Sequence, residues 1–205
     1  MHVPSHFRPR DEASAWQVMD DHPWATVVTT EGTGAPRAAP LPVLARPDRG
    51  ELVSHLARAN PMVADLARAG ATVLVVFQGP AGYVTPRWYG RPEPAVPTFD
   101  HVSVHVRGRP RLSEDPTEVL AVLRATVERF ERDAPEPWRL DTDTQFVRGL
   151  AHGVVAFSVA VEEVQAEFKL SQNMPLDEQR RVVAGFEATG RGELAAAMRD
   201  ELQLR

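Results

Sequence analysis

Apolar and polar side chains alternate along several short stretches of the chain, which is the spacing of β-strands. In the clearest stretch, from Thr98 to Arg107, three valines alternate with polar side chains, so one face is apolar and the other is available for a site. The connections are too short for crossover helices, and we expect an antiparallel meander with a hairpin turn at Gly79-Pro80. Runs rich in β-branched residues, bounded by Pro and Gly, predict further strands over residues 25–30, 37–45, 51–56, 71–78, 81–85 and 153–169.

Helical spacing is found outside these strands. Capping residues and prolines predict helices at residues 11–21, from Asn60-Pro61 to Gly70, and after Asp115-Pro116. Residues 177–202 predict two more helices, separated at Gly190-Arg191-Gly192. The helix after Asp115 has an apolar stripe that is expected to pack on the sheet, formed by Val119, Leu120, Leu123, Val127 and Phe130. We expect Trp16, Trp24 and Trp138 to be packing residues, and Glu162-Glu163 to be a solvated strand turn.

Composition limits the class of protein. The chain has 205 residues, of which 43% are hydrophobic, enough for one sizeable core. We expect one domain, with the sheet in residues 1–175 and a helical extension of it in residues 176–205. The formal net charge is -5 and the pI about 5.8, so the molecule as a whole has no basic field for phosphate backbones or anionic lipid. No helix-turn-helix with a basic second helix is visible, which argues against a nucleic-acid partner.

The absence of cysteine excludes disulfides, thiolate ligands and cysteine nucleophiles, so any metal ligand must be His, Asp, Glu, Tyr or Met. The amino-terminal segment lacks a basic stretch followed by an apolar one, and the longest apolar run, Val73 to Phe77, has only the length of a strand. We therefore expect a soluble cytoplasmic protein with no membrane association. The motifs of serine hydrolases, zinc proteases and phosphate-binding loops are also absent.

Five segments rich in polar, aromatic and glycine residues stand out in an ordered series, at residues 3–7, 54–61, 79–89, 96–108 and 169–173. They read Val-Pro-Ser-His-Phe, Ser-His-Leu-Ala-Arg-Ala-Asn-Pro, Gly-Pro-Ala-Gly-Tyr-Val-Thr-Pro-Arg-Trp-Tyr, Val-Pro-Thr-Phe-Asp-His-Val-Ser-Val-His-Val-Arg-Gly and Lys-Leu-Ser-Gln-Asn. In order and approximate spacing, from residue 1 to about residue 190, the chain resembles the PaiB-like family.

This resemblance implies the fold and a range of functions. The fold would be α+β and mainly β, a split β-barrel of the flavin reductase and pyridoxamine-phosphate oxidase type with peripheral helices. The barrel would be a homodimer that holds its cofactor in a groove shared by both subunits. Family members are usually described as FMN-binding negative transcriptional regulators. A smaller set of the same fold, the piperazate synthases, hold haem b and close an N–N bond.

Two departures from the usual PaiB pattern fall where a cofactor or substrate would lie. The usual Thr-Trp-Asn-Tyr is replaced by Thr98-Phe99-Asp100-His101, which puts an acid in place of an amide and an imidazole in place of a phenol. The loop from Trp88 to Val96 is also shorter than typical. Both changes argue against ordinary FMN binding.

His55 is the candidate ligand of a haem iron, because it lies at the end of a predicted strand just before the helix that begins near Asn60. The alternative is a buried histidine satisfied by a backbone carbonyl. The resemblance further implies that the residues holding the cofactor include Arg58, Asn60, Arg87, Trp88, Tyr89, Thr98, Ser171, Gln172 and Asn173.

Lys169 offers a cation for a carboxylate or phosphate, supported by the hydroxyl and amides that follow it. The alternative for this segment is the capping region of the next helix, with Ser171 and Asn173 as the caps. Arg87, beside two aromatic residues, could clamp an anion, or the aromatic residues could simply anchor the loop.

His101 and His105 lie about 13 Å apart along their strand, so they cannot bind one metal ion together. His105, within the family's Val-His motif, is the candidate proton-handling residue, and Lys169 the second candidate catalytic residue. His101 could equally be a solvated surface residue.

These residues lead to a first hypothesis, a haem-dependent enzyme that converts N5-hydroxy-L-ornithine to L-piperazate. The partners would then be a small amino-acid substrate and a second copy of the chain. Two alternatives are an FMN-binding regulator of PaiB type and a flavin-dependent oxidoreductase of a small molecule. The charge and the missing recognition helix argue against the regulator.

Overall fold

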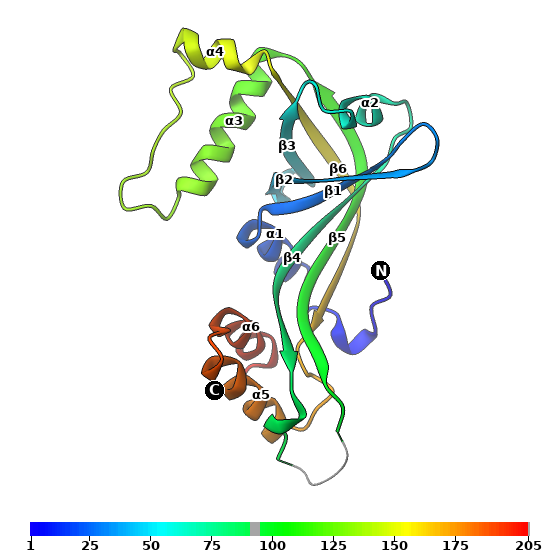
Figure 1. The fold of residues 1–205 in the computed structure, drawn as a ribbon, viewed down its shortest axis with the longest axis vertical. Coiled ribbons are helices and arrows are strands. Elements are labelled where there is room, and N and C mark those ends of the chain that lie inside the picture. The colour runs from blue at the N-terminus through cyan, green and yellow to red at the C-terminus, as the bar shows by residue number, and fades with distance from the viewer. Residues whose placement is uncertain (91–94, 205) are drawn as a thin grey trace. The chain divides into compact units, whose positions relative to one another are not determined.

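The computed structural model describes residues 1–90 and 95–204. The chain forms two compact units, each made from segments distant in sequence. The barrel unit comprises Met19–Phe77 and His105–Val164, and the terminal unit comprises Met1–Val18, Gln78–Val104 and Gln165–Arg205. Three long strands contribute residues to both units, and their far ends run together within the terminal unit (Figure 1).

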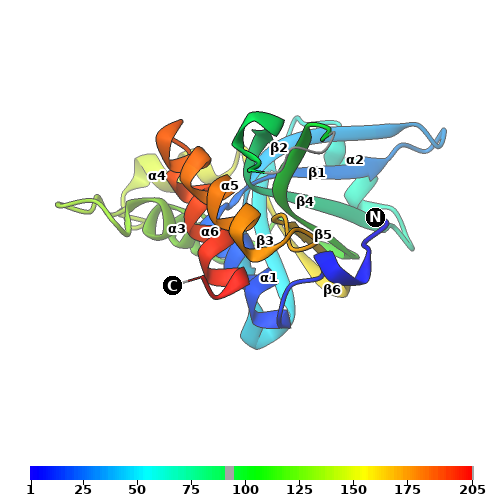
Figure 2. The ribbon, with the colours of Figure 1, turned by 90° about the horizontal axis from the view of Figure 1, so that it is seen from below.

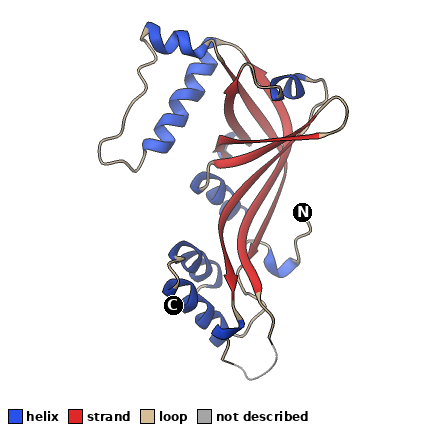
Figure 3. Ribbon diagram, viewed as in Figure 1, coloured by secondary structure: helices blue, strands red, loops and turns tan. Residues whose placement is uncertain are grey.

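A closed antiparallel barrel forms the centre of the barrel unit (Figure 3). Its strands follow the order β1-β2-β3-β6-β5-β4 in the described part of the chain. The register places Val27 opposite Ala39 and His55 opposite Ala156. The strands are β1 (Trp24–Thr30), β2 (Pro36–Arg46), β3 (Glu51–Ala57), β4 (Val73–Val84), β5 (Thr98–Ser113) and β6 (Val154–Lys169). The expected antiparallel split-barrel fold is confirmed.

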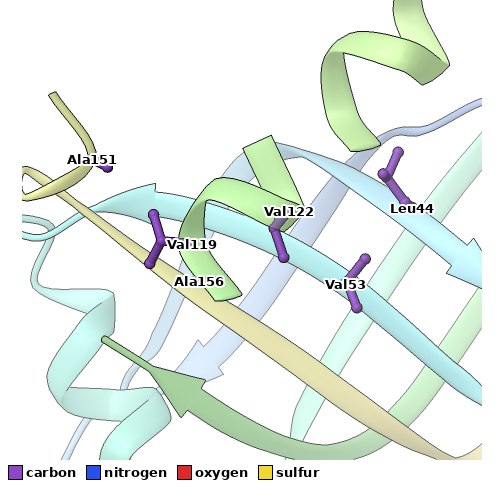
Figure 4. Close-up of a cluster of buried hydrophobic side chains, with 6 residues drawn as sticks. All are labelled: Leu44, Val53, Val119, Val122, Ala151 and Ala156. Atoms are coloured by element: carbon purple, nitrogen blue, oxygen red, sulfur yellow. The ribbon is translucent and has the colours of Figure 1, made fainter. Parts of the chain in front are cut away.

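The alternating pattern seen in the sequence directs the valines inward. Val27, Val75 and Val155 are completely buried. On the outside of the barrel, helix α3 (Pro116–Glu131) covers β2 and β3, and helix α4 (Gln145–Ala151) lies against α3. A second cluster joins these helices to the sheet (Figure 4), formed by Leu44, Val53, Val119, Val122, Ala151 and Ala156. A short helix, α2 (Met62–Ala67), packs against β1.

The terminal unit surrounds the far ends of β4, β5 and β6 with helices. Helix α5 (Leu176–Ala188) and helix α6 (Gly192–Leu202) lie side by side (Figure 2). Helix α5 also packs on the single turn η3 (Pro86–Trp88), where the Trp88 and Phe186 rings meet edge to face at 5.1 Å. Two further 3₁₀ turns are η1 (Ser5–Phe7), in this unit, and η2 (Pro47–Arg49), in the barrel unit.

Helix starts follow the predicted caps. Helix α1 (Glu12–Asp21) begins after Asp11, whose carboxylate accepts from the Ser14 N–H at 2.8 Å. Asp115 accepts from the Thr117 N–H at 2.7 Å at the start of α3. The Asn60 side chain accepts from the Met62 N–H at 2.9 Å at the start of α2. Within the described residues, no helix is both long and apolar enough to cross a membrane.

The predicted hairpin at Gly79-Pro80 is wrong, because β4 runs through both residues without turning. A Cβ atom at Gly79 would lie 3.0 Å from the Val102 Cβ, so the glycine allows β4 and β5 to approach closely. Helix α4 was not predicted from the sequence, and β5 continues six residues beyond its predicted end at Arg107, to Ser113. The loop predicted after β4 contains residues 91–94, which lie outside the described residues.

Several expected packing residues are exposed. Trp24 and Trp138 are 62% and 58% exposed, and Phe130, at the end of the predicted α3 stripe, is 51% exposed. Glu162 and Glu163 lie within β6, not at a strand turn. Their carboxylates pair with Arg109 and Arg107 on β5, because oppositely charged side chains on adjacent strands attract.

Candidate functional site

A row of chemically varied side chains crosses the ends of β4, β5 and β6 in the terminal unit. Lys169, the last residue of β6, donates from Nζ to the Phe99 backbone oxygen at 2.7 Å and to the Thr98 hydroxyl. An ammonium group has three N–H donors, so one remains for a ligand after these two contacts. Phe99 also meets Tyr83 edge to face, with ring centroids 5.8 Å apart. Both rings are largely exposed.

An acid–base pair lies in the same row. The Nε2 atom of His101 is 3.6 Å from a carboxylate oxygen of Glu167. The Glu167 side chain is only 15% exposed and that of His101 is 33% exposed. Glu167 and Lys169 are two residues apart on β6, so the strand's alternation places them on one face. The row thus comprises Tyr83, Phe99, His101, Glu167 and Lys169.

The opposite face of the same strand ends holds a buried polar contact. Asp100 is completely buried and accepts a 2.6 Å hydrogen bond from the hydroxyl of Ser171, which is also buried. The other carboxyl oxygen, Oδ1, has no hydrogen-bond partner among the described residues. Burial raises the pKa of Asp100 above its ordinary value, and the hydrogen bonds from Ser171 and the nearby charges of Lys169 and His101 oppose this only in part.

Ser171 itself has an unusual backbone. Its φ angle is +60°, in the left-handed region where a side chain is rarely found. The adjoining residues are tied down, since Gln172 accepts from the Leu170 N–H at 2.7 Å and donates to the Phe168 backbone oxygen. Asn173 is exposed. Ser171 and Asn173 are not the caps of α5, which begins after Pro175 at Leu176.

His55 belongs to the barrel unit, where it lies on β3 opposite Ala156. Burial lowers the pKa of His55 below its ordinary value, because desolvation disfavours the charged ring. Its Nδ1 atom is buried and has no hydrogen-bond partner among the described residues. An unpaired ring nitrogen of this kind costs stability unless a further group reaches the imidazole.

Two other candidates in the barrel unit are held by the protein itself. Arg58 donates to the His152 backbone oxygen at 2.9 Å and pairs with Glu114 at 2.6 Å. The side-chain oxygen of Asn60 accepts from the start of α2. His105 lies half-buried on β5, on the face opposite the buried Val104 and Val106.

The segment after β4 is anchored to helix α5. The Thr85 hydroxyl accepts from the Arg87 N–H at 3.3 Å. Trp88 packs against Phe186, and the N–H of Gly90, next to Tyr89, donates to both oxygens of the buried Glu178 at 3.1 Å. Trp88 therefore acts at least as an anchor of this segment.

The structure thus brings Thr98, Lys169 and Ser171 together in the terminal unit, while His55, Arg58, Asn60 and His105 belong to the barrel unit. The sequence analysis did not assign a role to Asp100, Glu167 or Tyr83. Asp100 had a usable signal, because it occupies the apolar face of a strand whose neighbouring positions are valines. Glu167 had none, because its partner comes from another strand.

The comparisons with known proteins identify the family. Residues 1–163 match a family described as “Putative FMN-binding domain”. The chain is 31% identical to “Protease synthase and sporulation protein PAI 2” of Bacillus subtilis, across 99% of both chains. This chain belongs to the PaiB-like family of FMN-binding split barrels.

Relatives and solved structures extend the similarity. An uncharacterized protein of Emericella nidulans is 28% identical over 69% of this chain and 68% of its own. The flavocytochrome Anf3 of Azotobacter vinelandii superposes with a TM-score of 0.62 at 17% identity, covering 82% of this chain and 72% of that chain. The FAD and heme binding protein of Mycobacterium smegmatis superposes with a TM-score of 0.61 at 21% identity, covering 83% of this chain and 77% of that chain. The two solved structures share the split-barrel fold of this chain.

Proposed function

We propose that this PaiB-like protein is a haem-dependent enzyme that converts N5-hydroxy-L-ornithine to L-piperazate. The observation that carries the proposal is the acid–base pair His101–Glu167 beside the cation of Lys169. His101 and Asp100 stand at two of the three positions where this chain departs from the usual Thr-Trp-Asn-Tyr motif. An enzyme that moves protons needs such a pair, whereas a protein that only binds FMN does not.

The reaction is an internal dehydration that needs no external oxidant or reductant. The α-nitrogen forms a bond to N5 while the N5–O bond breaks, the α-nitrogen loses a proton, and the hydroxyl leaves as water after gaining one. Lys169 would bind the substrate carboxylate through its remaining N–H donor. His101, oriented by Glu167, would accept the proton of the α-amine. The sequence motif favoured His105 for this role; we assign it to His101 because a Glu167 carboxylate oxygen lies 3.6 Å from the His101 Nε2 atom.

His55 would hold the iron. The lowered pKa of His55 fits this role, since only an unprotonated imidazole nitrogen can bind a metal. Ferric haem would supply Lewis-acid chemistry when bound. Two proteins with this fold are named for a haem group, the Azotobacter flavocytochrome and the Mycobacterium FAD and heme binding protein, which supports a haem in this barrel.

A second candidate is a flavin-binding protein, either an oxidoreductase or a regulator of PaiB type. The family description favours it, because it names FMN. The buried Nδ1 atom of His55, which has no hydrogen-bond partner among the described residues, is also compatible with a hydrogen bond to a polar atom of a flavin. The net charge of -5 argues against direct DNA binding by the molecule as a whole.

Absorption spectroscopy of the purified protein separates these candidates. We expect a Soret band, and formation of L-piperazate from N5-hydroxy-L-ornithine by mass spectrometry. His55→Ala should abolish the Soret band and the activity without changing the far-UV circular dichroism. His152→Ala, which removes an exposed histidine, is the matched control and should leave both unchanged. Flavin absorption alone, with no haem taken up on reconstitution, would reject the enzyme proposal in favour of the flavin alternative.

The same assay assigns the proton-handling residue. We expect His101→Ala and Glu167→Gln each to lower kcat while the Soret band remains, and His105→Ala to have the smaller effect. Loss of kcat in His105→Ala alone would return the role to His105.

A further inference from the structure

We propose that Asp100 is a positioning residue, which acts through Ser171 to fix residues 169–173 so that Lys169 presents its ammonium group to the substrate. The identity of the substrate rests on the function proposed above. The coupling between Asp100 and the lysine does not, because it follows from contacts within the terminal unit.

The first observation is the cost of the contact. Asp100 is completely buried, and one of its carboxyl oxygens has no hydrogen-bond partner in residues 1–90 and 95–204. Ser171 is held at a φ angle of +60°. An apolar side chain at position 100 would pack against the neighbouring valines and would leave no polar atom without a hydrogen bond. A left-handed serine is likewise strained compared with glycine. Two unfavourable features that depend on each other indicate that the geometry they produce is needed.

The second observation is where the contact leads. Only Leu170 separates Ser171 from Lys169 in the chain. Leu170 is completely buried, so its packing restricts the backbone between these two residues. The Asp100 carboxylate accepts a hydrogen bond from the Ser171 hydroxyl. The two residues just before it on β5 accept hydrogen bonds from the Lys169 ammonium group, Thr98 through its hydroxyl and Phe99 through its backbone oxygen. Three consecutive residues of β5 thus hold both ends of one short segment. Releasing Ser171 should therefore release the lysine.

Lys169 is the only lysine in the chain, so its exposure can be measured directly. The test uses the rate at which an amine-acylating reagent modifies Lys169 in the full-length protein, followed by peptide mass spectrometry. We expect Asp100→Leu and Ser171→Ala each to speed acylation several-fold and to speed amide hydrogen exchange in residues 169–173. Asp100→Asn keeps an acceptor for the Ser171 hydroxyl and should stay close to wild type. Ser103→Ala, a hydroxyl removed from the same strand, is the control.

Kinetics supply the functional readout. In the two disruptive variants, KM for N5-hydroxy-L-ornithine should rise about tenfold or more, as expected when a charge-assisted hydrogen bond is lost. The Soret band should stay unchanged, and Asp100→Leu/Ser171→Ala should be no worse than the stronger single variant. Additive effects of the two substitutions, or unchanged acylation and exchange in a folded Asp100→Leu, would overturn the proposal.

The outcomes keep the two proposals apart. A wild-type protein without haem or turnover rejects the proposed enzyme, while acylation and exchange still test the coupling. If Asp100→Leu fails to fold, the comparison of Ser171→Ala with Asp100→Asn decides, and equal acylation rates in these two variants and the wild type reject the coupling.

Discussion

At the scale of single residues, the local environment decides what a side chain can do. Asp100 and Glu167 lie near the same strand ends, but Asp100 is completely buried while Glu167 keeps some exposure and faces His101. Burial makes the charged form of Asp100 costly, so the folded protein binds the Asp100 proton more tightly than the unfolded chain does. The two carboxylates are therefore suited to different tasks, one to positioning and the other to proton transfer.

The stability of the protein should reveal this difference as pH changes. The raised pKa of Asp100 contributes stability that is full below its ordinary value of 3.8 and is lost as the pH rises through the folded-state pKa. Asn at this position does not titrate. Asp100→Asn should therefore gain stability relative to wild type as the pH rises above 3.8. Urea denaturation at a series of pH values measures the gap, and a gap that narrows with rising pH would contradict the assignment.

At the scale of elements, close packing explains residues whose local preference points elsewhere. Gly79 and Pro80 favour a turn, but β4 continues through them because β5 packs against the bare backbone of the glycine. Gly185 lies inside helix α5, where glycine is unfavourable. It is needed there because Trp88 lies against the helix backbone at this point.

Replacing this glycine should destabilise the terminal unit. A Cβ atom at Gly185 would lie 2.3 Å from the Trp88 ring, so Gly185→Ala should cost about 1–3 kcal/mol although alanine is the better helix former. Gly192→Ala is the matched control, because nothing lies within 4 Å of its Cβ position. Thermal denaturation should show a lower Tm for the first variant and no loss for the second. Equal Tm values would mean that Trp88 is free to move away.

At the scale of the whole molecule, the chain combines a closed barrel with a surface that retains large apolar side chains. Trp24 on β1 and Phe146 on α4 are 62% and 74% exposed. Both side chains are therefore accessible at the surface. The homodimer remains a prediction from the family resemblance.

Light scattering after size exclusion tests this expectation. The protein should have twice the chain mass of 22.6 kDa. If the cofactor groove is shared by two subunits, as the resemblance implies, the assembly is part of the folded state and the dimer should persist on dilution. A monodisperse monomer that retains its full cofactor would contradict the shared groove.

The sequence by itself determined the elements that depend on local spacing. The alternation of valines from Thr98 onward and the caps at Asp11 and Asp115 were enough to predict a strand and two helices, because alternation and capping act over a few residues. Ordered motifs also indicated the family, which the comparisons confirmed.

Only the tertiary structure decided which side chains meet. The partners of Asp100 and Lys169 are 71 and 70 or 71 residues away in the chain, a separation that no local pattern encodes. The same holds for β4, where the neighbouring strand overrides the turn preference of Gly79-Pro80. Burial and strand register are properties of the folded whole, so the Asp100–Ser171 contact and the His101–Glu167 pair become visible only in three dimensions.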